Sequence, residues 1–297
     1  MSKVIDTALG VGLGFKPEHF AEALAETRPG QWWEVHPENH LVDGGPRWHM
    51  LQALRERHPL SLHSVSLSLA APTPMPPHRL DALVEMNRRL EPALVSEHLA
   101  WSWWQGAYAP DLLPARRTGF LLNWLVQRVD ALQNRLGRTI AIENPSHYVP
   151  LTHDWDEVDF LHALAQRSGC HLLIDVNNVA VSAHNLGLDP EQWLSRIDGT
   201  LVAEIHLAGH HPDPLLGDAL WIDGHDTPIS AGVWNLYHAL ISRIGSRPTL
   251  IERDDQIPPY AELQLEADRA RRLCQLTLDT PLVNRAAKQT LSEPTHG

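Results

Sequence analysis

Cysteine is scarce in this chain, where only Cys170 and Cys274 occur among 297 residues. They lie far apart, form no Cys-x-x-Cys pair and suggest no disulfide framework, so a reducing cytoplasm is the expected location. The same scarcity argues against a structural zinc site built from cysteines. Both thiols are expected to behave as small buried hydrophobes rather than as nucleophiles.

Long apolar runs and an excess of basic residues are also missing. No apolar stretch approaches the roughly 18 residues of a membrane span. Lys3 and Asp6 make the first residues a poor signal peptide. Lys+Arg 24 against Asp+Glu 36 gives a net charge of −12. This charge argues against nucleic acid as a partner. It is compatible with carboxylates that are gathered to bind cations.

Eight short apolar strands can be recognised in the chain, each followed by a helical pattern or a long loop. The strands are expected at residues 8–15, 32–39, 60–65, 93–98, 139–144, 170–177, 201–211 (with the strand exit) and 249–254. Six helices are expected, at residues 18–27, 47–57, 79–90, 118–136, 156–168 and 260–274.

This alternation predicts parallel βαβ units, and eight of them predict an α/β fold, the (β/α)8 TIM barrel. One catalytic domain is expected over residues 1–285, followed by a polar, disordered tail at 286–297. An open doubly wound sheet is the alternative. The glycine-rich segment 10–14 lies within the first strand and lacks the GxGxxG spacing, so it is not interpreted as a phosphate loop.

The seventh strand places Glu204 and His206 on one face and apolar residues on the other. A buried Glu or His must be paired, hydrogen-bonded or bound to a metal. His206, nearer the strand exit, is the expected metal ligand. Glu204, one alternation deeper, is expected to orient a ligand through a hydrogen bond.

Polar residues recur at the carboxyl ends of the other strands, where TIM barrels carry their active sites. A lone His or Glu at such a place is usually structural, and His36, His40, His58, His147 and His162 are assigned that role. The joint recurrence in barrel order favours a site instead. Its candidates are Glu38, Asn39, His63, Glu97, His98, Glu143, Asn144, Asp175, Asn177, Asn178, His206, His210, Asp223, His225, Glu252 and Asp254.

These residue types point to a metal centre. Closely packed carboxylates raise each other's pKa unless a cation neutralises them. A mixed set of Glu, Asp and His suits zinc, manganese or iron, whereas an all-oxygen set would suit magnesium or calcium. The candidate ligands outnumber those that one ion needs, so two or three ions are expected.

With these residues in place, the chain resembles the multinuclear iron-dependent oxidative enzymes that modify cysteines of ribosomally made peptides, the methanobactin-biosynthesis type. The resemblance extends from Gly10 to about Arg272. It rests on Gly-Val-Gly-Leu at 10–13, Pro-Glu-Asn at 37–39, Ser-Leu-His at 61–63, Ser-Glu-His-Leu-Ala-Trp at 96–101, Asp-Leu-Leu-Pro at 111–114, Ile-Glu-Asn-Pro-Ser at 142–146, Asp-Val-Asn-Asn at 175–178, Glu-Ile-His-Leu-Ala-Gly-His at 204–210 and Ile-Glu-Arg-Asp at 251–254.

The resemblance implies a TIM barrel that holds two or three iron ions and uses O2 as oxidant. It implies that a core pair of ions is bound by His63, His98, Glu143, Asp175, His206 and Glu252, with Glu143 bridging. Asn177, Asp223 and His225 would form a third, looser site. Glu143, Asp175 and His206 are the expected catalytic residues. Expected contacts to substrate or to the ligands come from Glu38, Asn39, Glu97, Asn144, Asn178, Glu204, His210 and Asp254.

The implied reaction is the oxidation of cysteine in a precursor peptide, aided by a small partner protein that binds the leader. The substrate thiolate would bind iron, and hydrogen would be removed near the cysteine Cβ. Three positions depart from the family pattern. Phe15 stands where a basic residue is expected, Ser64 replaces a glycine, and Arg253 replaces an aromatic residue.

Two other functions remain open from the residues. A divalent-metal isomerase or endonuclease-type hydrolase, acting on a sugar or a phosphodiester, would use the same ligands with zinc or manganese and no O2. A non-enzymatic metal-binding scaffold is the third possibility. It predicts that Glu143→Ala or His206→Ala leaves the biological role intact.

Overall fold

The structure, a computed structural model, describes residues 9–40, 44–104 and 106–279. The expected polar tail at 286–297 lies outside these residues. Within the described ranges, no helix has the length and apolar character required to cross a bilayer.

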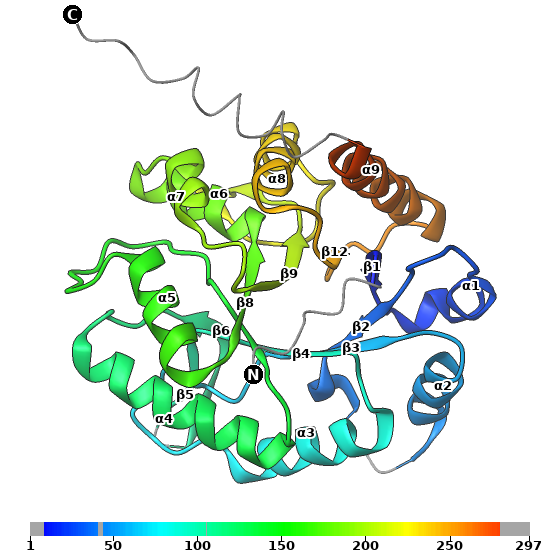
Figure 1. Cartoon of the computed structure of the whole chain (residues 1–297), viewed down its shortest axis with the longest axis horizontal. Helices are drawn as coiled ribbons and strands as arrows, with labels where there is room; N and C mark the ends of the chain where they lie inside the picture. Colours follow the sequence, from blue (N-terminus) through cyan, green and yellow to red (C-terminus); the bar gives the residue numbers. More distant parts are fainter. Residues whose placement is uncertain (1–8, 41–43, 105, 280–297) are drawn as a thin grey trace, which may run out of the picture.

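Eight strands form a closed barrel in the order β1-β12-β9-β8-β7-β4-β3-β2 (Figure 1). Every neighbouring pair is parallel, which confirms the expected TIM barrel. The barrel strands are β1 Val11–Gly14, β2 Trp33–Val35, β3 Leu60–Ser64, β4 Leu94–His98, β7 Ala141–Glu143, β8 His171–Asp175, β9 Val202–Leu207 and β12 Thr249–Ile251.

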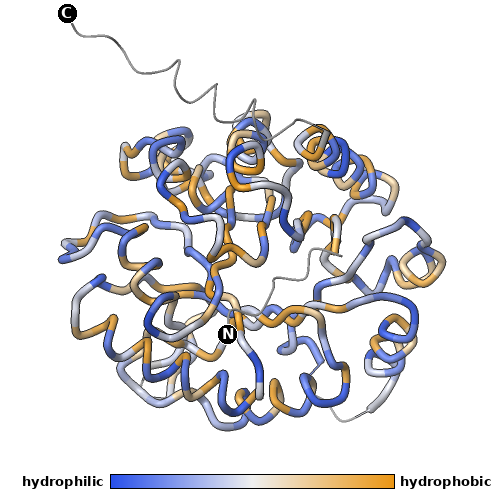
Figure 2. Tube along the Cα trace, viewed as in Figure 1, coloured by the Kyte–Doolittle hydropathy of each residue, from blue (hydrophilic) through white to orange (hydrophobic). Residues whose placement is uncertain are grey.

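Helices surround this barrel, and the apolar outer faces of the strands pack against them. Leu62, Ile142, Ile174 and Ile205 are fully buried, and hydrophobic residues run along much of the central barrel (Figure 2). The helices are α1 Phe20–Ala25, α2 Pro46–Arg55, α3 Pro77–Leu90, α4 Gly119–Leu136, α5 Glu157–Ser168, α6 Val176–Leu186, α7 Pro190–Arg196, α8 Ala231–Ile244 and α9 Tyr260–Asp279, with short 3-10 turns η1 Pro17–His19 and η2 Pro37–His40.

The sixth strand is shorter than the sequence predicts. Strand β8 ends at Asp175, whose side chain accepts a hydrogen bond from the backbone N–H of Asn178 and so caps α6. Asn177 and Asn178 therefore lie on the first turn of a helix. Helices α6, α7 and α8 were not predicted from the sequence.

Two β-hairpins also differ from the expected loops. Strands β5 (Trp101–Trp104) and β6 (Ala107–Leu113) form one antiparallel hairpin, and β10 (His211–Asp213) pairs with β11 (Gly217–Ile222) in the other. Each hairpin follows the carboxyl end of a barrel strand. They therefore extend the end of the barrel where the site is expected.

The glycine-rich first strand has a packing function. The indole ring of Trp32 lies against Gly12, and a Cβ at that position would come within 2.4 Å of the ring carbons. Only glycine allows this approach without displacement of the indole. The segment belongs to the barrel wall, in agreement with the expectation that it is no phosphate loop.

Candidate metal centre

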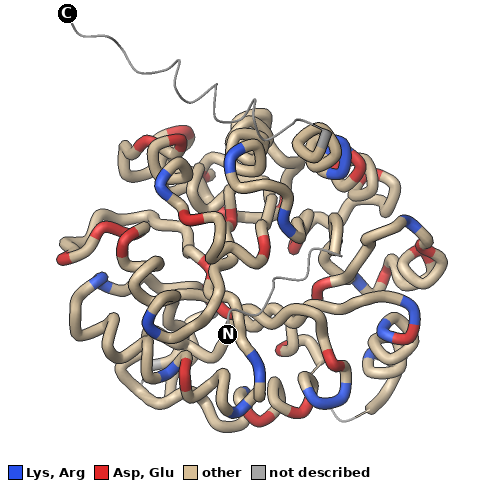
Figure 3. The backbone as a smooth tube through the Cα atoms, viewed as in Figure 1, with Lys and Arg blue, Asp and Glu red and all other residues tan. Residues whose placement is uncertain are grey.

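The carboxyl ends of the strands enclose a cavity of about 270 Å³. Acidic residues lie on the central strands as well as on the outer helices (Figure 3). No Lys or Arg occurs among the described residues that line the cavity. They are His36, Val65, His98, Tyr108, Asp111, Leu112, Ser146, Tyr148, Asp223, Gly224, His225, Glu252 and Asp254.

His63, His98 and Glu143 converge at one side of the barrel. The strand register pairs His98 with Glu143 across β4 and β7. Glu143 Oε2 lies 3.1 Å from His63 Nε2 and 3.1 Å from His98 Nε2, and the two nitrogens are 3.3 Å apart. A tetrahedral ion with bonds of about 2.1 Å sets its ligand atoms about 3.4 Å apart, so this spacing suits three ligands of one ion.

A second group lies beside the first. The register pairs Asp175 with His206 across β8 and β9. His206 Nδ1 lies 3.2 Å from Glu252 Oε2, and ligand atoms of His206, His63 and Glu143 lie within 4.8 Å of one another. The six residues expected to hold a pair of ions are therefore contiguous.

The third group continues from the second toward the opening of the barrel. His225 contributes a ligand atom within 4.8 Å of those of Asp175 and Glu252. Asp223 Oδ1 lies 2.8 Å from His225 Nε2 and accepts a hydrogen bond of 2.6 Å from Asn177 Nδ2. Asn177 from α6 thus meets Asp223 and His225 from the segment after β11.

The buried atoms of these groups fit a bound cation. Glu143 Oε2 and Asp175 Oδ2 accept no hydrogen bond within the described ranges, although both residues are at most 1% exposed. Buried polar atoms are normally paired. Nitrogen and carboxylate donors of this kind suit zinc, manganese or iron, and magnesium or calcium would require oxygen ligands throughout.

The pKa shifts indicate which protons a cation would replace. Burial raises the pKa of Glu143 to about 8. Burial, reinforced by Glu143, raises that of Asp175 well above its ordinary value. Burial lowers the pKa of His63 to about 4, and burial with His63 lowers that of His98. Without a cation, these shifts favour the protonated carboxyls of Glu143 and Asp175 and the neutral imidazoles of His63 and His98, whose lone pairs can bind a metal.

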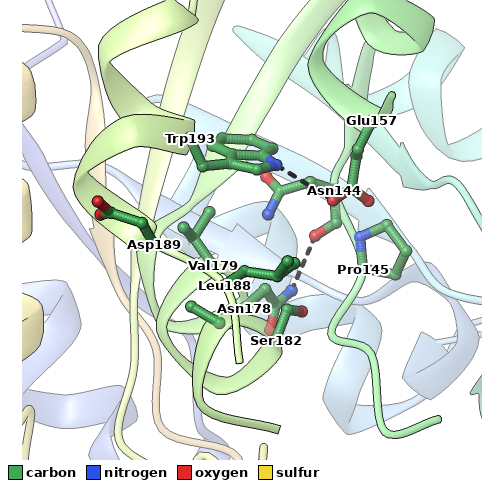
Figure 4. A pocket seen from close by; sticks show the side chains of 10 residues that line it. Asn144, Pro145, Glu157, Asn178, Val179, Ser182, Leu188, Asp189 and Trp193 are labelled. Atoms are coloured by element: carbon green, nitrogen blue, oxygen red, sulfur yellow. Dashed lines mark hydrogen bonds between the residues drawn. The ribbon is translucent and has the colours of Figure 1, made fainter. Parts of the chain in front are cut away.

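Two asparagines hold the strand ends in place. Asn144 bonds to both backbone groups of Asp175, which ties the end of β7 to that of β8. Asn178 donates to Glu143 Oε1 at 3.2 Å and to the carbonyl of Asn144 at 3.0 Å. Figure 4 shows this side of α6, where Asn178 points toward Asn144. Glu143 Oε1 is thereby occupied, and Oε2 stays free to bind a metal.

Two predicted carboxylates support the loop after β3 instead of lining the cavity. Glu38 Oε1 accepts bonds from Ser64 Oγ, Val65 N and Ser66 Oγ. Glu97 accepts from the backbone of Leu67, and burial together with Glu38 raises its pKa well above its ordinary value. Their effect on the metal ligands is therefore indirect.

Asn39 is exposed on η2 and does not line the cavity. The strand β2 ends at Val35, because Pro37 begins this turn. The sequence prediction placed the end of the strand four residues later. It therefore named Asn39, did not name Glu34, and assigned His36 a structural role.

Glu34 is the main residue that the sequence prediction missed, and the structural role predicted for His36 is corrected, because His36 lines the cavity. Glu34 lies within 4.8 Å of Glu204 and His206, and His36 within 4.8 Å of Glu252 and Asp254. Although burial alone would lower it, the hydrogen bond to Asp254 raises the pKa of His36 to about 9. The alternation in the second strand was the available signal, since it places Glu34 and His36 on one face.

Of the two remaining predicted contacts, Asp254 lines the cavity and His210 contacts Asn177 of the third group. His210 Nδ1 lies 2.7 Å from Asn177 Oδ1, and the ring stacks on Trp221 of β11. Asp254 lies 2.9 Å from Lys16 Nζ and 3.3 Å from His225 Nδ1. Lys16 thus places a basic group at this site two residues after Gly14.

The other departures from the family pattern are accommodated locally. Ser64 donates to Glu38. Arg253 is buried and forms an ion pair of 3.2 Å with Glu266 of α9. Neither side chain displaces a predicted ligand.

The β5–β6 hairpin contributes one wall of the cavity. Tyr108, Asp111 and Leu112 of β6 line it. Trp103 of β5 lies against Tyr108, with ring centroids 5.1 Å apart, and thus supports this wall. Of the histidines assigned structural roles, His40, His58, His147 and His162 do not line the cavity.

Comparison with known proteins identifies the family of the chain. Residues 10–275 match the family described as RiPP precursor modification enzyme MbnB/TglH/ChrH. The chain belongs to this family. A UPF0276 protein of Caulobacter vibrioides is 51% identical over 286 residues, covering 96% of this chain and 98% of the relative. A UPF0276 protein of Bordetella bronchiseptica is 44% identical over 260 residues, 87% of this chain and 90% of the relative.

Solved structures agree on the fold alone. D-psicose 3-epimerase from Clostridium cellulolyticum superposes with a TM-score of 0.56 at 11% identity, covering 91% of this chain and 97% of that one. Endonuclease IV from Thermus thermophilus gives a TM-score of 0.56 at 15% identity, covering 91% and 99%. The MbnB/TglH/ChrH family is thus a family of peptide-modifying enzymes on a TIM barrel that many other enzymes share.

Proposed function

We propose that this member of the MbnB/TglH/ChrH family is a multinuclear non-haem iron oxidoreductase. It would oxidise cysteine residues of a ribosomally synthesised precursor peptide with O2. The observation that supports this most strongly is the unbroken succession of three ligand groups at the mouth of one barrel. A peptide-modifying family supplies the substrate class, and the resemblance of the motifs supplies iron and O2.

Each ion would be held by residues already in contact. His63 and His98 would bind one ion, and Asp175, His206 and Glu252 a second. Glu143 lies between these sets and would bridge them. Asn177, Asp223 and His225 would form the third site. Bound iron would supply an attachment point for the substrate thiolate and the redox chemistry with O2, which no side chain here provides.

The chain's own residues position the substrate and limit access to water. Glu143, Asp175 and His206, the proposed catalytic residues, are at most 1% exposed. They lie next to residues that line the cavity, namely His98, His225 and Glu252. Tyr108, Leu112 and Tyr148 form apolar parts of its wall. A cysteine side chain entering here would leave bulk water before it reaches the ligand groups.

The cavity lining disfavours phosphate-containing substrates. It includes the carboxylates Asp111, Asp223, Glu252 and Asp254. Nucleic-acid and phosphate sites depend on Lys and Arg. Neither occurs among the described residues of the lining, and Lys16 beside it is already paired with Asp254 at 2.9 Å. We therefore favour a peptide over a nucleic acid, delivered by a small leader-binding partner protein.

The test uses short cysteine-containing reading frames next to the gene, produced as peptides with any adjacent partner protein. Iron-loaded enzyme in air should change the mass of a peptide at cysteine, and the same mixture without O2 should not. Conversion that proceeds equally without O2 would contradict an oxidase.

One observation favours a second function. The fold shared with D-psicose 3-epimerase and endonuclease IV, together with the His and carboxylate groups at its mouth, would also suit a divalent-metal isomerase or hydrolase. That function predicts activity with zinc or manganese under nitrogen. The anaerobic experiment therefore separates the two.

A further inference from the structure

Four buried polar atoms converge inside the barrel beneath the metal ligands. They are Glu34 Oε1, both carboxylate oxygens of Glu204, and His206 Nε2, and none has a hydrogen-bond partner within the described ranges. Glu34 is 2% exposed, and Glu204 and His206 are 0% exposed. Unpaired polar atoms at this depth are costly, so their convergence needs an explanation.

The two ring nitrogens of His206 face different groups. Nδ1 faces Glu252 Oε2 at 3.2 Å, on the side of the proposed ions. Nε2 faces the interior, 3.5 Å from Glu34 Oε1 and 3.5 Å from Glu204 Oε1. These last distances exceed a normal hydrogen bond by a few tenths of an ångström. A small movement of either side chain would close one.

Glu34 is itself held in place. Ser61 Oγ on the neighbouring strand donates to Glu34 Oε2 at 3.0 Å, which leaves Oε1 directed at the imidazole. Glu204 precedes His206 by two residues on β9 and so shares its inward face. The histidine ring is thus contacted from two strands, and β2 contributes no residue to the proposed core pair.

We propose that Glu34 and Glu204 are positioning residues that together accept the Nε2–H of His206. A histidine that binds metal through one nitrogen usually donates the N–H of the other to a carboxylate, which fixes the tautomer and ring orientation. The pair would present the Nδ1 lone pair to the ion shared with Asp175 and Glu252. This inference rests on the proposed function only in requiring a metal at His206.

The first experiment measures metal affinity without peptide or O2. Cobalt(II) is titrated into chelator-treated protein against a competing chelator, for wild type, Glu34→Gln and the double variant Glu34→Gln/Glu204→Gln. We expect an unchanged number of ions at saturation. One equivalent should bind roughly 10–100-fold more weakly in the double variant, with the other equivalents unchanged.

Two variants control for buried charge and folding. Glu157→Gln removes another buried carboxylate with a histidine partner, His147 at 2.6 Å, outside the cavity. It should leave every cobalt affinity unchanged. Glu34→Asp keeps a carboxylate on β2 and should recover part of the lost affinity. A merely structural role would not give this pattern.

The second experiment examines the ring directly in zinc-loaded protein. A slowly exchanging ring N–H proton, assigned to His206 by its loss in His206→Gln, should be present in wild type. It should shift in Glu34→Gln and exchange faster in the double variant. A His206 ring whose protonated nitrogen faces away from both carboxylates would overturn the proposal.

The remaining outcomes are distinguishable. Unchanged cobalt affinities in the double variant would overturn this inference and leave the proposed function standing. Loss of one whole ion at saturation would show that Glu34 and Glu204 bind a cation directly, which also overturns a positioning role. A wild-type chain that binds no cobalt, zinc or iron would contradict both proposals.

Discussion

The core pair and the third site at the barrel mouth are built on different kinds of backbone. His63, His98, Glu143, Asp175 and His206 lie on barrel strands, and Glu252 directly follows β12. All six side chains are buried. Asn177 of the third site is on a helix, and Asp223 and His225 are on a connection that retains 11% and 14% side-chain exposure.

His225 also has an unusual backbone conformation. Its φ is +49°, in the left-handed region that non-glycine residues rarely adopt. Its N–H bonds to the carbonyl of Gly209, and its carbonyl accepts from the backbone N–H of Asp254. Such strain is maintained by surrounding contacts and is frequent at functional sites. The comparison teaches that the core pair is fixed by the barrel itself, whereas the third site depends on added segments.

The largest effect is expected at Glu143, the residue between the two halves of the core pair. Glu143→Gln removes the charged oxygen that faces both His63 and His98. Metal affinity should fall by more than the roughly 100-fold that limits losses of outer-shell partners, and peptide conversion should disappear. Iron per chain and product mass are the measurements. Glu157→Gln is the control, and iron retention by Glu143→Gln would contradict a bridging role.

A smaller effect is expected at the third site. Asp223→Asn should weaken one ion by about tenfold or more, because it removes a charged partner of His225, and should leave the core pair loaded. Chelator titration measures this. Asp218→Asn, a change of the same chemistry at an exposed position of β11, should bind as wild type does. Loss of all ions in Asp223→Asn would show that the two regions are not separable.

The free energy of unfolding should depend strongly on side chains of the barrel and only weakly on those of the β10–β11 hairpin. Ile205→Ala truncates a fully buried side chain of β9 and should lower the free energy of unfolding by about 2–5 kcal/mol. Leu215→Ala changes a residue that is 93% exposed between β10 and β11 and should stay within about 0.5 kcal/mol. Urea denaturation measures both. Equal effects would contradict the division between barrel and added segments.

The smallest effect on metal binding is expected at Glu26, which lies outside both metal sites. Burial alone would raise the pKa of Glu26. Hydrogen bonds from Tyr260, Arg28 and Thr27 outweigh this effect and lower the pKa to about 2. The folded-state pKa is below the unfolded value, so this stabilisation is complete above about pH 4.5 and is lost as the pH falls toward 2.

Glu26→Gln should therefore destabilise the chain by about 1.5–3 kcal/mol at pH 7, and this difference from wild type should shrink as the pH falls below about 4.5. Denaturation at several pH values measures it. Cobalt affinity at pH 7 should be unchanged, because Glu26 bonds to α9 rather than to the mouth. A difference that grows in acid would show the opposite sign of the pKa shift.

The barrel and most of its mouth could be predicted from the sequence. The carboxyl ends of the strands meet at one end of a parallel barrel, whatever the structure of the segments that connect them. That rule correctly brings His63, His98, Glu143 and His206 together. It does not locate groups below the strand ends. Glu34 was therefore missed, since its role depends on which residue of β9 lies across the barrel interior.

Other errors came from local backbone signals. Asp175 caps a helix at a point where the strand was expected to continue to Asn177, so α6 was missed and Asn177 was placed on the strand. The hairpins depend on antiparallel pairing between segments that resemble loops. Consequently Tyr108 and Asp111 could not be assigned to the cavity before the structure was known.

The most direct test of the account is the iron content of freshly purified wild-type protein beside that of Glu143→Gln and Asp223→Asn, after growth with added iron. We predict two or three irons per chain in wild type, the core pair alone in Asp223→Asn, and a loss of core-pair iron in Glu143→Gln. Stoichiometric zinc in place of iron, or the same iron content in all three proteins, would contradict it.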